Sequence, residues 1–385
     1  MQCSYLSRSK TPRSKGSTNF ILHFMETDKI TYLLGAGASA NRIPVVEAFN
    51  GVLSGFIQYI NKLSLPDRKY TGDNSEIPVT KSMLKDRFIH EANELYREII
   101  SHASIDTYAR KLHLLRADQK LRRLKALTSI FLIFRHITEG YDIRYDIFLA
   151  TVLGLDTNKT DIILPQKMQI LTWNYDFQLE MAAANFFRNN SITKVQELLN
   201  INPRQSKIQI DQDSNFFSVI KLNGSASGYL DNDKYRPMEF SLALIDKNNL
   251  EEITGLIEEL LSYYYWFTFP PSSATSNIMY AWEKDSQPSQ LRDFATKKII
   301  DTTVLVIIGY SFPTFNRQVD KALLKEMPLL KNVYIQAKSK SIKGIYDRFV
   351  ALLGRDRLKE IEAPHLIEVK KNDEEFYIPF QFTGA

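Results

Sequence analysis

Polar side chains follow three apolar runs of this sequence, directly after the point where each run ends. These residues, with the glycines beside them, are Asn174 and Asp176 in LTWNYD, Asn223, Gly224 and Ser225 in KLNGS, and Gly309 and Ser311 in IIGYSF. Amide, hydroxyl and carboxyl groups can hold the ribose hydroxyls and the carboxamide of a nucleotide. An Asn or Asp in such a place can also simply cap a helix, but three such segments in one chain favour a ligand site.

A glycine-rich turn follows a fourth apolar run. The segment GAGASA, from Gly35 to Ala40, matches G-x-G-x-x-A, a pattern in which glycines let the backbone approach a pyrophosphate. The same segment would serve equally as a tight turn that binds nothing. A dinucleotide-dependent dehydrogenase needs an acidic residue about 20 positions further on, at the end of a second strand. The segment VLSGFIQYINKLSLPD offers neither that strand nor that carboxylate, so hydride transfer is disfavoured.

These segments need a sheet to bring them together. Short apolar runs rich in Val, Ile, Leu and Tyr predict buried parallel strands. The runs are Ile30–Leu34, Met168–Thr172, Val219–Leu222, Val304–Ile308 and Val333–Ile335. Most are followed by a loop and a helical pattern, which is typical of a doubly wound, Rossmann-like α/β sheet. Ligands of such sheets bind at the carboxyl ends of the strands, so we expect the polar segments to meet there.

Two stretches depart from this alternation, and the first 24 residues stand apart from it. Charged segments with helical spacing from about 66 to 165 predict a large all-helical insertion. A second insertion is expected from about 240 to 301. Residues 1–24 are rich in Ser, Arg and Lys and contain no acid, so we expect a disordered leader or upstream extension, with a transit peptide as the alternative. The α/β domain, with its two insertions, would then span 25–385.

Composition limits the class of protein. The chain has 385 residues, 44% hydrophobic and 24% charged, which is typical of a soluble globular protein. No apolar run is long enough to cross a membrane. Cys3 is the single cysteine, which excludes an intramolecular disulfide and a cysteine zinc site and fits a cytoplasmic protein. Residues 1–24 carry four charges of the formal net charge of +5, so we predict no direct nucleic-acid binding.

The ordered set GAGAS, TWNYD, KLNGS and GYSF resembles the sirtuin-like superfamily, whose members bind NAD on a Rossmann-type sheet and cleave its nicotinamide–ribose bond. More narrowly, SIDTYARKL and VIIGYSFPTFNR resemble segments of bacterial sirtuin-like proteins of antiphage defence. Those proteins degrade NAD as effectors, and some assemble with a HerA-type ring ATPase. The resemblance spans about residues 28–340.

The resemblance implies an NAD site built from the turn and the strand ends. The expected NAD contacts are Gly35, Ala36, Gly37 and Ser39 at the diphosphate, Gly309, Ser311 and Phe312 at the adenosine, Gln336 near the adenine ribose, and Pro44, Gly224 and Ser225. Asn174 would hold the nicotinamide ribose and the attacking water. Asp176 would hydrogen-bond the nicotinamide amide. No metal is expected, because the sequence shows no metal-ligand spacing.

Asn223 is the largest departure from the family pattern, because the family has its catalytic His before this Gly. Asn can bond to a ribose but has no proton to titrate near neutral pH, whereas a general base commonly contributes about 10²–10⁴-fold to a rate. Three interpretations stay open: the residue was introduced to trap ligand, ribose distortion and Asp176 sustain the reaction, or the protein binds without turnover. None of the six histidines follows a strand, and His136 is the first candidate for a replacement base.

Two other departures concern the substrate. Deacetylating sirtuins carry a four-cysteine zinc module and an acyl-lysine cleft, whereas this chain has one cysteine and a helical insertion, so protein deacetylation is disfavoured. The family's Pro-Asp-Phe-Arg segment is matched by Pro44 alone. Arg42 and Phe49 are the candidate substitutes for the residues that would shield the reactive ribose.

The sequence therefore predicts an NAD hydrolase that releases nicotinamide and ADP-ribose through an oxocarbenium-like ribose, a route that depends on electrostatic positioning. A hydrolase that depletes cellular NAD has to stay inactive until triggered. We therefore expect regulation by assembly as a homo-oligomer, with the helical insertion as the contact surface. The main alternative is a non-catalytic sensor subunit that binds NAD or an ADP-ribose derivative and signals to a partner ATPase or nuclease. An ADP-ribosyl transferase or deacylase is a weaker third candidate.

Overall fold

A computed structural model gives the fold of most of the chain. It describes residues 28–44, 46–67, 69, 79–158, 160–203, 216–232, 234–269, 272–283, 288–354, 357–358, 367–370 and 374–384. The predicted leader, residues 1–24, lies outside the described residues, and Cys3 with it.

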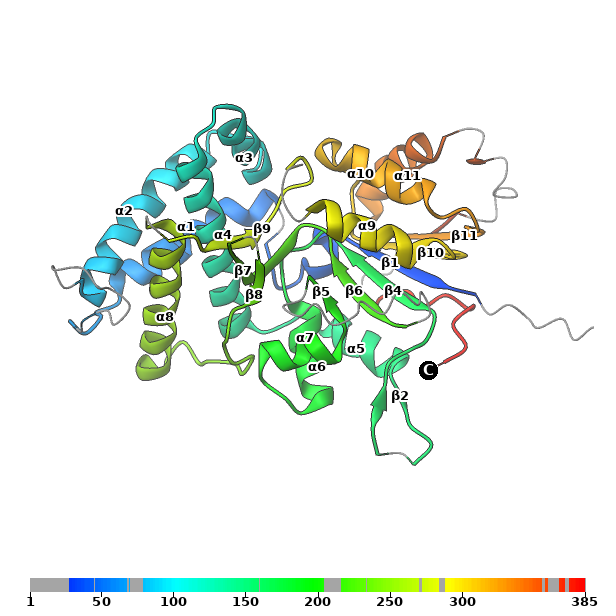
Figure 1. Cartoon of the computed structure of the whole chain (residues 1–385), viewed down its shortest axis with the longest axis horizontal. Coiled ribbons are helices and arrows are strands. Elements are labelled where there is room, and N and C mark those ends of the chain that lie inside the picture. Colours follow the sequence, from blue (N-terminus) through cyan, green and yellow to red (C-terminus); the bar gives the residue numbers. More distant parts are fainter. Residues whose placement is uncertain are drawn as a thin grey trace, which may run out of the picture.

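A seven-stranded parallel sheet forms the centre of the fold (Figure 1). Its strands are β1 (Ile30–Leu34), β4 (Met168–Thr172), β5 (Ile201–Asn202), β6 (Ser218–Lys221), β10 (Val304–Ile308), β11 (Asn332–Gln336) and β12 (Ile367–Lys370). They stand in the order β12, β11, β10, β1, β4, β6, β5. The five predicted strands agree with β1, β4, β6, β10 and β11 to within one residue at each end. The predicted α/β fold with a Rossmann-like sheet is confirmed.

The sheet separates two apolar cores, because successive side chains of a strand point to opposite faces. On β1, Tyr32 and Leu34 belong to one core, and Leu33 between them belongs to the other. Both faces are buried, which is why the strands read as continuous apolar runs rather than as an alternation of apolar and polar residues.

Helices cover both faces and extend one of the two cores away from the sheet. They are α1 (Val46–Lys62), α2 (Lys81–Ile99), α3 (Ile105–Leu114), α4 (Asp118–Glu139), α5 (Ile143–Val152), α6 (Gln178–Phe187), α7 (Ile192–Leu198), α8 (Leu250–Thr268), α9 (Pro288–Ile299), α10 (Arg317–Lys325) and α11 (Ser339–Leu353). The core of Leu33 includes residues of α9, α10 and α11. The core of Tyr32 includes residues of α5 and α6 and continues into α1, α2, α3, α4 and α8, which form the helical body on the left of Figure 1.

The predicted insertions differ from the structure in two respects. The stretch 66–165 is not all-helical, because β2 (Gly154–Leu155) and β3 (Ile162–Ile163) form an antiparallel hairpin near its end. Strands of two residues leave no periodic pattern for sequence reasoning to detect. The stretch 240–301 divides between two places: α8 packs on α2 and α4, whereas α9 covers the main sheet.

A second, antiparallel sheet was not predicted. It has the order β8 (Lys234–Pro237), β7 (Gly224–Asp231), β9 (Thr275–Ile278), and it packs against α4. Among the helices that the structure describes, none is long and apolar enough to cross a membrane.

The order in which the chain adds its strands to the main sheet places a crevice beside β1. The chain adds β4 and β6 on one side of β1 and then returns to add β10 and β11 on the other side. Leu34 pairs with both Thr172 and Ile308, so the loops after β1, β4 and β10 leave the sheet at one level. Such a reversal of strand order opens a crevice at the carboxyl ends of the strands.

Candidate functional site

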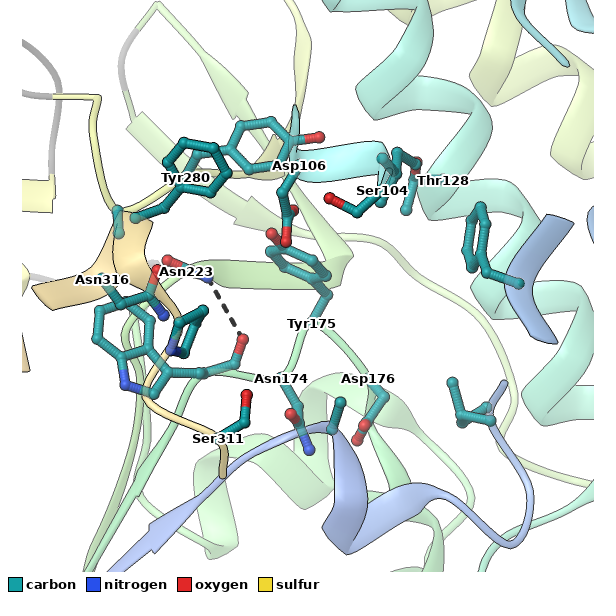
Figure 2. Close-up of a pocket in the computed structure, with 18 of the residues that line it drawn as sticks. Ser104, Asp106, Thr128, Asn174, Tyr175, Asp176, Asn223, Tyr280, Ser311 and Asn316 are labelled. Atoms are coloured by element: carbon teal, nitrogen blue, oxygen red, sulfur yellow. Dashed lines mark hydrogen bonds between the residues drawn. The ribbon is translucent and has the colours of Figure 1, made fainter. Parts of the chain in front are cut away.

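A cavity of about 260 Å³ lies at this edge of the sheet (Figure 2). Its floor comes from the loops after β1, β4, β6 and β10, and its roof comes from α3, α4 and the segment after β9. The predicted site residues that line it are Ala36, Pro44, Asn174, Asp176, Asn223, Gly309 and Ser311. Three strand ends that are distant in the sequence thus meet at one cavity, as expected.

The other predicted contacts lie behind the cavity wall or away from it. Gly35, Gly37, Ser39, Gly224 and Ser225 stand behind the lining residues and do not line the cavity themselves. Phe312 packs in the apolar core against Tyr310, with ring centroids 4.7 Å apart. Of the two candidate substitutes for the Pro-Asp-Phe-Arg residues, Phe49 lines the cavity and Arg42 does not.

Gln336 is held by the C-terminal segment of the chain. Its Nε2 donates to the carbonyl of Glu375 at 2.6 Å, and its Oε1 accepts the amide of Tyr377 at 3.0 Å. The side chain is buried and does not line the cavity. Both of its polar groups therefore bind the segment near Tyr377, and the expected contact with an adenine ribose stays a prediction.

The glycine-rich turn is shaped by the loop after β10. The segment forms a short 3-10 turn, η1 (Ala36–Ser39), and the next α-helix starts only at Val46. The amide of Gly37 donates to the carbonyl of Gly309 at 2.9 Å. A Cβ on Gly37 would lie 2.6 Å from the Gly309 Cα. The glycines thus let two backbones touch, and Ala36 is the residue of this turn that faces the cavity.

Asn174 ties the loop after β4 to the turn after β1. Its Nδ2 donates to the Gly35 carbonyl at 3.0 Å and to the Ser39 hydroxyl at 3.4 Å. The Ser39 hydroxyl in turn bonds to the Tyr145 hydroxyl at 3.0 Å. Within the described ranges, Asn174 Oδ1 accepts no hydrogen bond, so it is available to a ligand.

Asp176 follows Asn174 in the same loop. Burial raises the pKa of its carboxyl group, and the nearby Lys221 amine and the Ser39 hydroxyl oppose that rise. Lys221 is 2% exposed and donates to the Asp176 carbonyl oxygen at 2.6 Å. Its charge is balanced by Glu180, which is 1% exposed and 2.5 Å away. A buried ion pair therefore holds the backbone that carries Asp176.

Asn223 presents an unpaired acceptor at the cavity. Its Nδ2 makes one long hydrogen bond of 3.5 Å to the Trp173 carbonyl (Figure 2), and its Oδ1 is buried with no hydrogen-bond partner in the described part of the chain. A buried acceptor without a partner is costly, and a ligand hydroxyl would satisfy it. Gly224 follows as the first residue of β7, with a φ of +75°, and it lies against the Asn277 carbonyl of β9.

Sequence reasoning missed Asp106, a carboxyl group on the roof. Ser104 caps α3 by accepting the Thr107 amide at 3.2 Å, and Asp106 lies in the first turn that this cap fixes. Burial raises the pKa of Asp106 to about 6. The only sequence signal is the pattern S-x-D at a helix start, which usually marks a cap and a favourable helix dipole.

An aromatic pair under the cavity was also missed. Trp173 stacks on Tyr310 with ring centroids 6.0 Å apart, and the Tyr310 hydroxyl donates to both oxygens of Asp320. Asn316 donates to the same hydroxyl at 3.0 Å. Burial raises the pKa of Asp320 to about 7, although the Tyr310 hydrogen bonds and the nearby Trp173 indole oppose the rise. These contacts fix the floor on the side of Ser311.

His136 is not the replacement base that the sequence suggested. Its Nδ1 bonds to the Leu132 carbonyl at 2.6 Å, and its Nε2 accepts the Phe177 amide at 3.2 Å. The ring stacks on Phe177 and is fully buried, which lowers its pKa to about 3. Both nitrogens are occupied, so the neutral ring positions the segment next to Asp176. The other described histidines, His90, His102 and His113, do not line the cavity either.

Comparisons with known proteins do not add an identity to this site. The chain matches no known protein family, and no curated protein is detectably similar to it.

Proposed function

We propose that this chain binds NAD+ at the carboxyl edge of its parallel sheet and hydrolyses the bond between nicotinamide and ribose. The observation that carries the proposal is the convergence of Asn174, Asp176 and Asn223 on one cavity at the point where the strand order reverses. Two amide oxygens without a partner among the described residues, and a carboxyl group, are what a ribose and a carboxamide require. The predicted resemblance to sirtuin-like proteins supports the same substrate.

The residues of the floor have separate tasks in the proposed reaction. The bond from ribose C1′ to the nicotinamide nitrogen breaks, and its electron pair leaves with the ring. Asn174 Oδ1 and Asn223 Oδ1 accept hydrogen bonds from the ribose hydroxyls, and Asp176 bonds to the nicotinamide carboxamide. Water adds to C1′, which gives ADP-ribose and releases one proton. Dipoles that are fixed before the substrate binds stabilise the developing charge without reorganisation.

The lining of the cavity suits a cationic ring. Tyr175 and Tyr280 contribute aromatic rings, with centroids 6.3 Å apart, and Trp282 stacks on Tyr280 at 4.9 Å. Among the described residues that line the cavity there is no Lys or Arg. The ribose ring carries the positive charge in the oxocarbenium-like transition state, and aromatic faces and carboxylates attract that charge. The diphosphate would be held by neutral donors such as Ser311.

A non-catalytic sensor is the second candidate, and Asn223 favours it. Asn stands where the resemblance expects a catalytic His, and no described histidine lines the cavity. Such a subunit would bind NAD or an ADP-ribose derivative and signal to a partner ATPase or nuclease. The hydrolase is preferred because the cavity offers titratable carboxyl groups at Asp106 and Asp176.

The proposed setting is a cytoplasmic, NAD-depleting effector of bacterial antiphage defence that is regulated by assembly. It rests on the resemblance, which includes a HerA-type ring ATPase as a candidate partner. Leu114 and Leu115, at the end of α3, are each 66% exposed and offer an apolar contact for a second copy of the chain. Light scattering coupled to gel filtration tests this: a lone monomer at all concentrations, with and without candidate partners, would count against it.

Nicotinamide release from NAD+ tests the proposed activity. The purified chain is compared with Asn174→Ala and with Asn93→Ala, a control whose side chain is exposed on α2. We expect the wild-type chain and the control to release nicotinamide, and Asn174→Ala to be slower by about 10²-fold or more. If no variant releases nicotinamide, alone or with candidate partners, while calorimetry shows NAD binding, the sensor replaces the hydrolase.

Asn223→His belongs to the same experiment. If this variant releases nicotinamide much faster than the wild-type chain, Asn223 limits the natural rate or is an introduced block. An unchanged rate would show that the base of this site lies elsewhere.

A further inference from the structure

Asp106 faces the cavity from the side opposite Asp176 (Figure 2). It belongs to the helical body, whereas Asp176 belongs to the sheet. No hydrogen bond or ion pair reaches the Asp106 carboxyl oxygens from any residue that the structure describes. A carboxyl group that is set in a cavity without a structural partner is available to a ligand.

The groups around Asp106 leave it as a base of intermediate strength. Tyr175 and Tyr280 face it, and burial raises the pKa of both hydroxyls far above neutral. Beyond them, Glu283 is paired with Lys125 at 2.6 Å. On α3 itself, Arg110 and His113 pack against the Trp282 ring. With a pKa of about 6, Asp106 is ionised at neutral pH and is still a stronger base than an exposed aspartate.

We propose that Asp106 is the general base of this site, in the role that Asn223 cannot fill. The inference rests on the proposed NAD hydrolysis. Nicotinamide bonds to Asp176 on the floor, so water approaches ribose C1′ from the roof. Two carboxyl groups on opposite sides of a scissile glycosidic bond are the arrangement by which many glycosidases admit a water molecule. This places the water on the side of Asp106 rather than on Asn174.

The proposed step moves one proton from water to Asp106 and releases one leaving group. The Asp106 carboxylate accepts one proton of the water, whose oxygen forms the bond to C1′. The C1′–N bond breaks, and its electron pair leaves with neutral nicotinamide. The second hydrogen of the water stays on the new C1′ hydroxyl, and the proton on Asp106 passes to solvent. One consequence is structural: the helical body supplies the base, so a movement of α3 away from the sheet stops the reaction.

The test compares Asp106→Asn with Asp118→Asn, a control in which an exposed aspartate in the first turn of α4 is changed in the same way. Nicotinamide release is measured from pH 5 to 8, and NAD binding is measured by calorimetry. For the wild-type chain and the control, kcat/KM should rise with pH through about 6. Asp106→Asn should bind NAD within about threefold, lose about 10²–10⁴-fold in rate, and lose this acid limb. Asp106→Glu should recover part of the rate.

The outcomes separate this inference from the proposed function. If the wild-type chain binds NAD but releases no nicotinamide, the hydrolase itself is wrong and the base falls with it. If the wild-type chain is active and Asp106→Asn keeps its rate, or loses rate but keeps the same acid limb, NAD hydrolysis stands and Asp106 is not the base.

Discussion

The amide of Gly37 donates a hydrogen bond to the carbonyl of Gly309 at 2.9 Å, and the two glycines bring the loops after β1 and β10 into backbone contact. This contact fixes the positions of Ala36 and Ser311 at the cavity. The glycine pattern that predicted a pyrophosphate cradle thus has a structural role of its own in this fold.

Replacing Gly37 by Ala should destabilise the protein, because the new Cβ would lie 2.6 Å from the Gly309 Cα and 2.9 Å from its carbonyl oxygen. Overpacking of this kind costs about 1–3 kcal/mol in the free energy of unfolding. Gly51→Ala is the control: Gly51 is exposed on α1 with no neighbour within 4 Å, and this change should stabilise by about 0.5–1 kcal/mol. Urea denaturation measures both. Equal stability of the two variants would contradict the packing role.

Asn223→Leu should separate ligand binding from stability. The wild-type side chain makes one long hydrogen bond of 3.5 Å and leaves Oδ1 buried without a described partner. Leu removes the buried unpaired acceptor and loses one weak hydrogen bond, so the free energy of unfolding should change by less than about 1 kcal/mol. NAD affinity should nevertheless fall by about tenfold, the contribution of one hydrogen bond. Urea denaturation and calorimetry are the two measurements, and unchanged NAD affinity would remove Asn223 from the site.

His136 should make the protein less stable in acid. Its pKa is lowered from 6.5 to about 3 in the folded protein, mainly by burial, so the unfolded chain binds the proton more readily. The free energy of unfolding therefore falls as pH drops below 6.5, by about 2 kcal/mol between pH 7 and pH 5. In His136→Gln this part of the pH dependence should disappear. Denaturation at both pH values checks it, and the other histidines, present in both proteins, cancel. Identical slopes would show that His136 does not titrate in this way.

Lys221→Met should be strongly destabilising, because it leaves Glu180 buried without its cation. Loss of one partner of a buried ion pair costs about 3–5 kcal/mol. The double variant Lys221→Met with Glu180→Leu should regain most of that stability. It should not regain the proposed activity, because the Asp176 carbonyl still lacks its donor. Denaturation and nicotinamide release together decide this, and a double variant with full activity would show that Lys221 does not position Asp176.

The sequence by itself determined the sheet and its polar edge. Buried parallel strands are short apolar runs, and a side chain that follows such a run is at the carboxyl end of the strand whatever the rest of the chain does. Asn174, Asp176, Asn223 and Ser311 were found in this way, and all four line the cavity.

Only the tertiary structure decided what covers that edge. Asp106 reaches the cavity because α3 packs on α2 and α4 and lies over the sheet, an arrangement of long-range contacts that leaves no local pattern. The same holds for the Gln336 amide, which bonds to the segment near Glu375, and for the His136 Nε2, which accepts the amide of Phe177. Local periodicity specifies where a strand ends, but the partner of a buried polar group is chosen by packing between elements, which no single stretch of sequence contains.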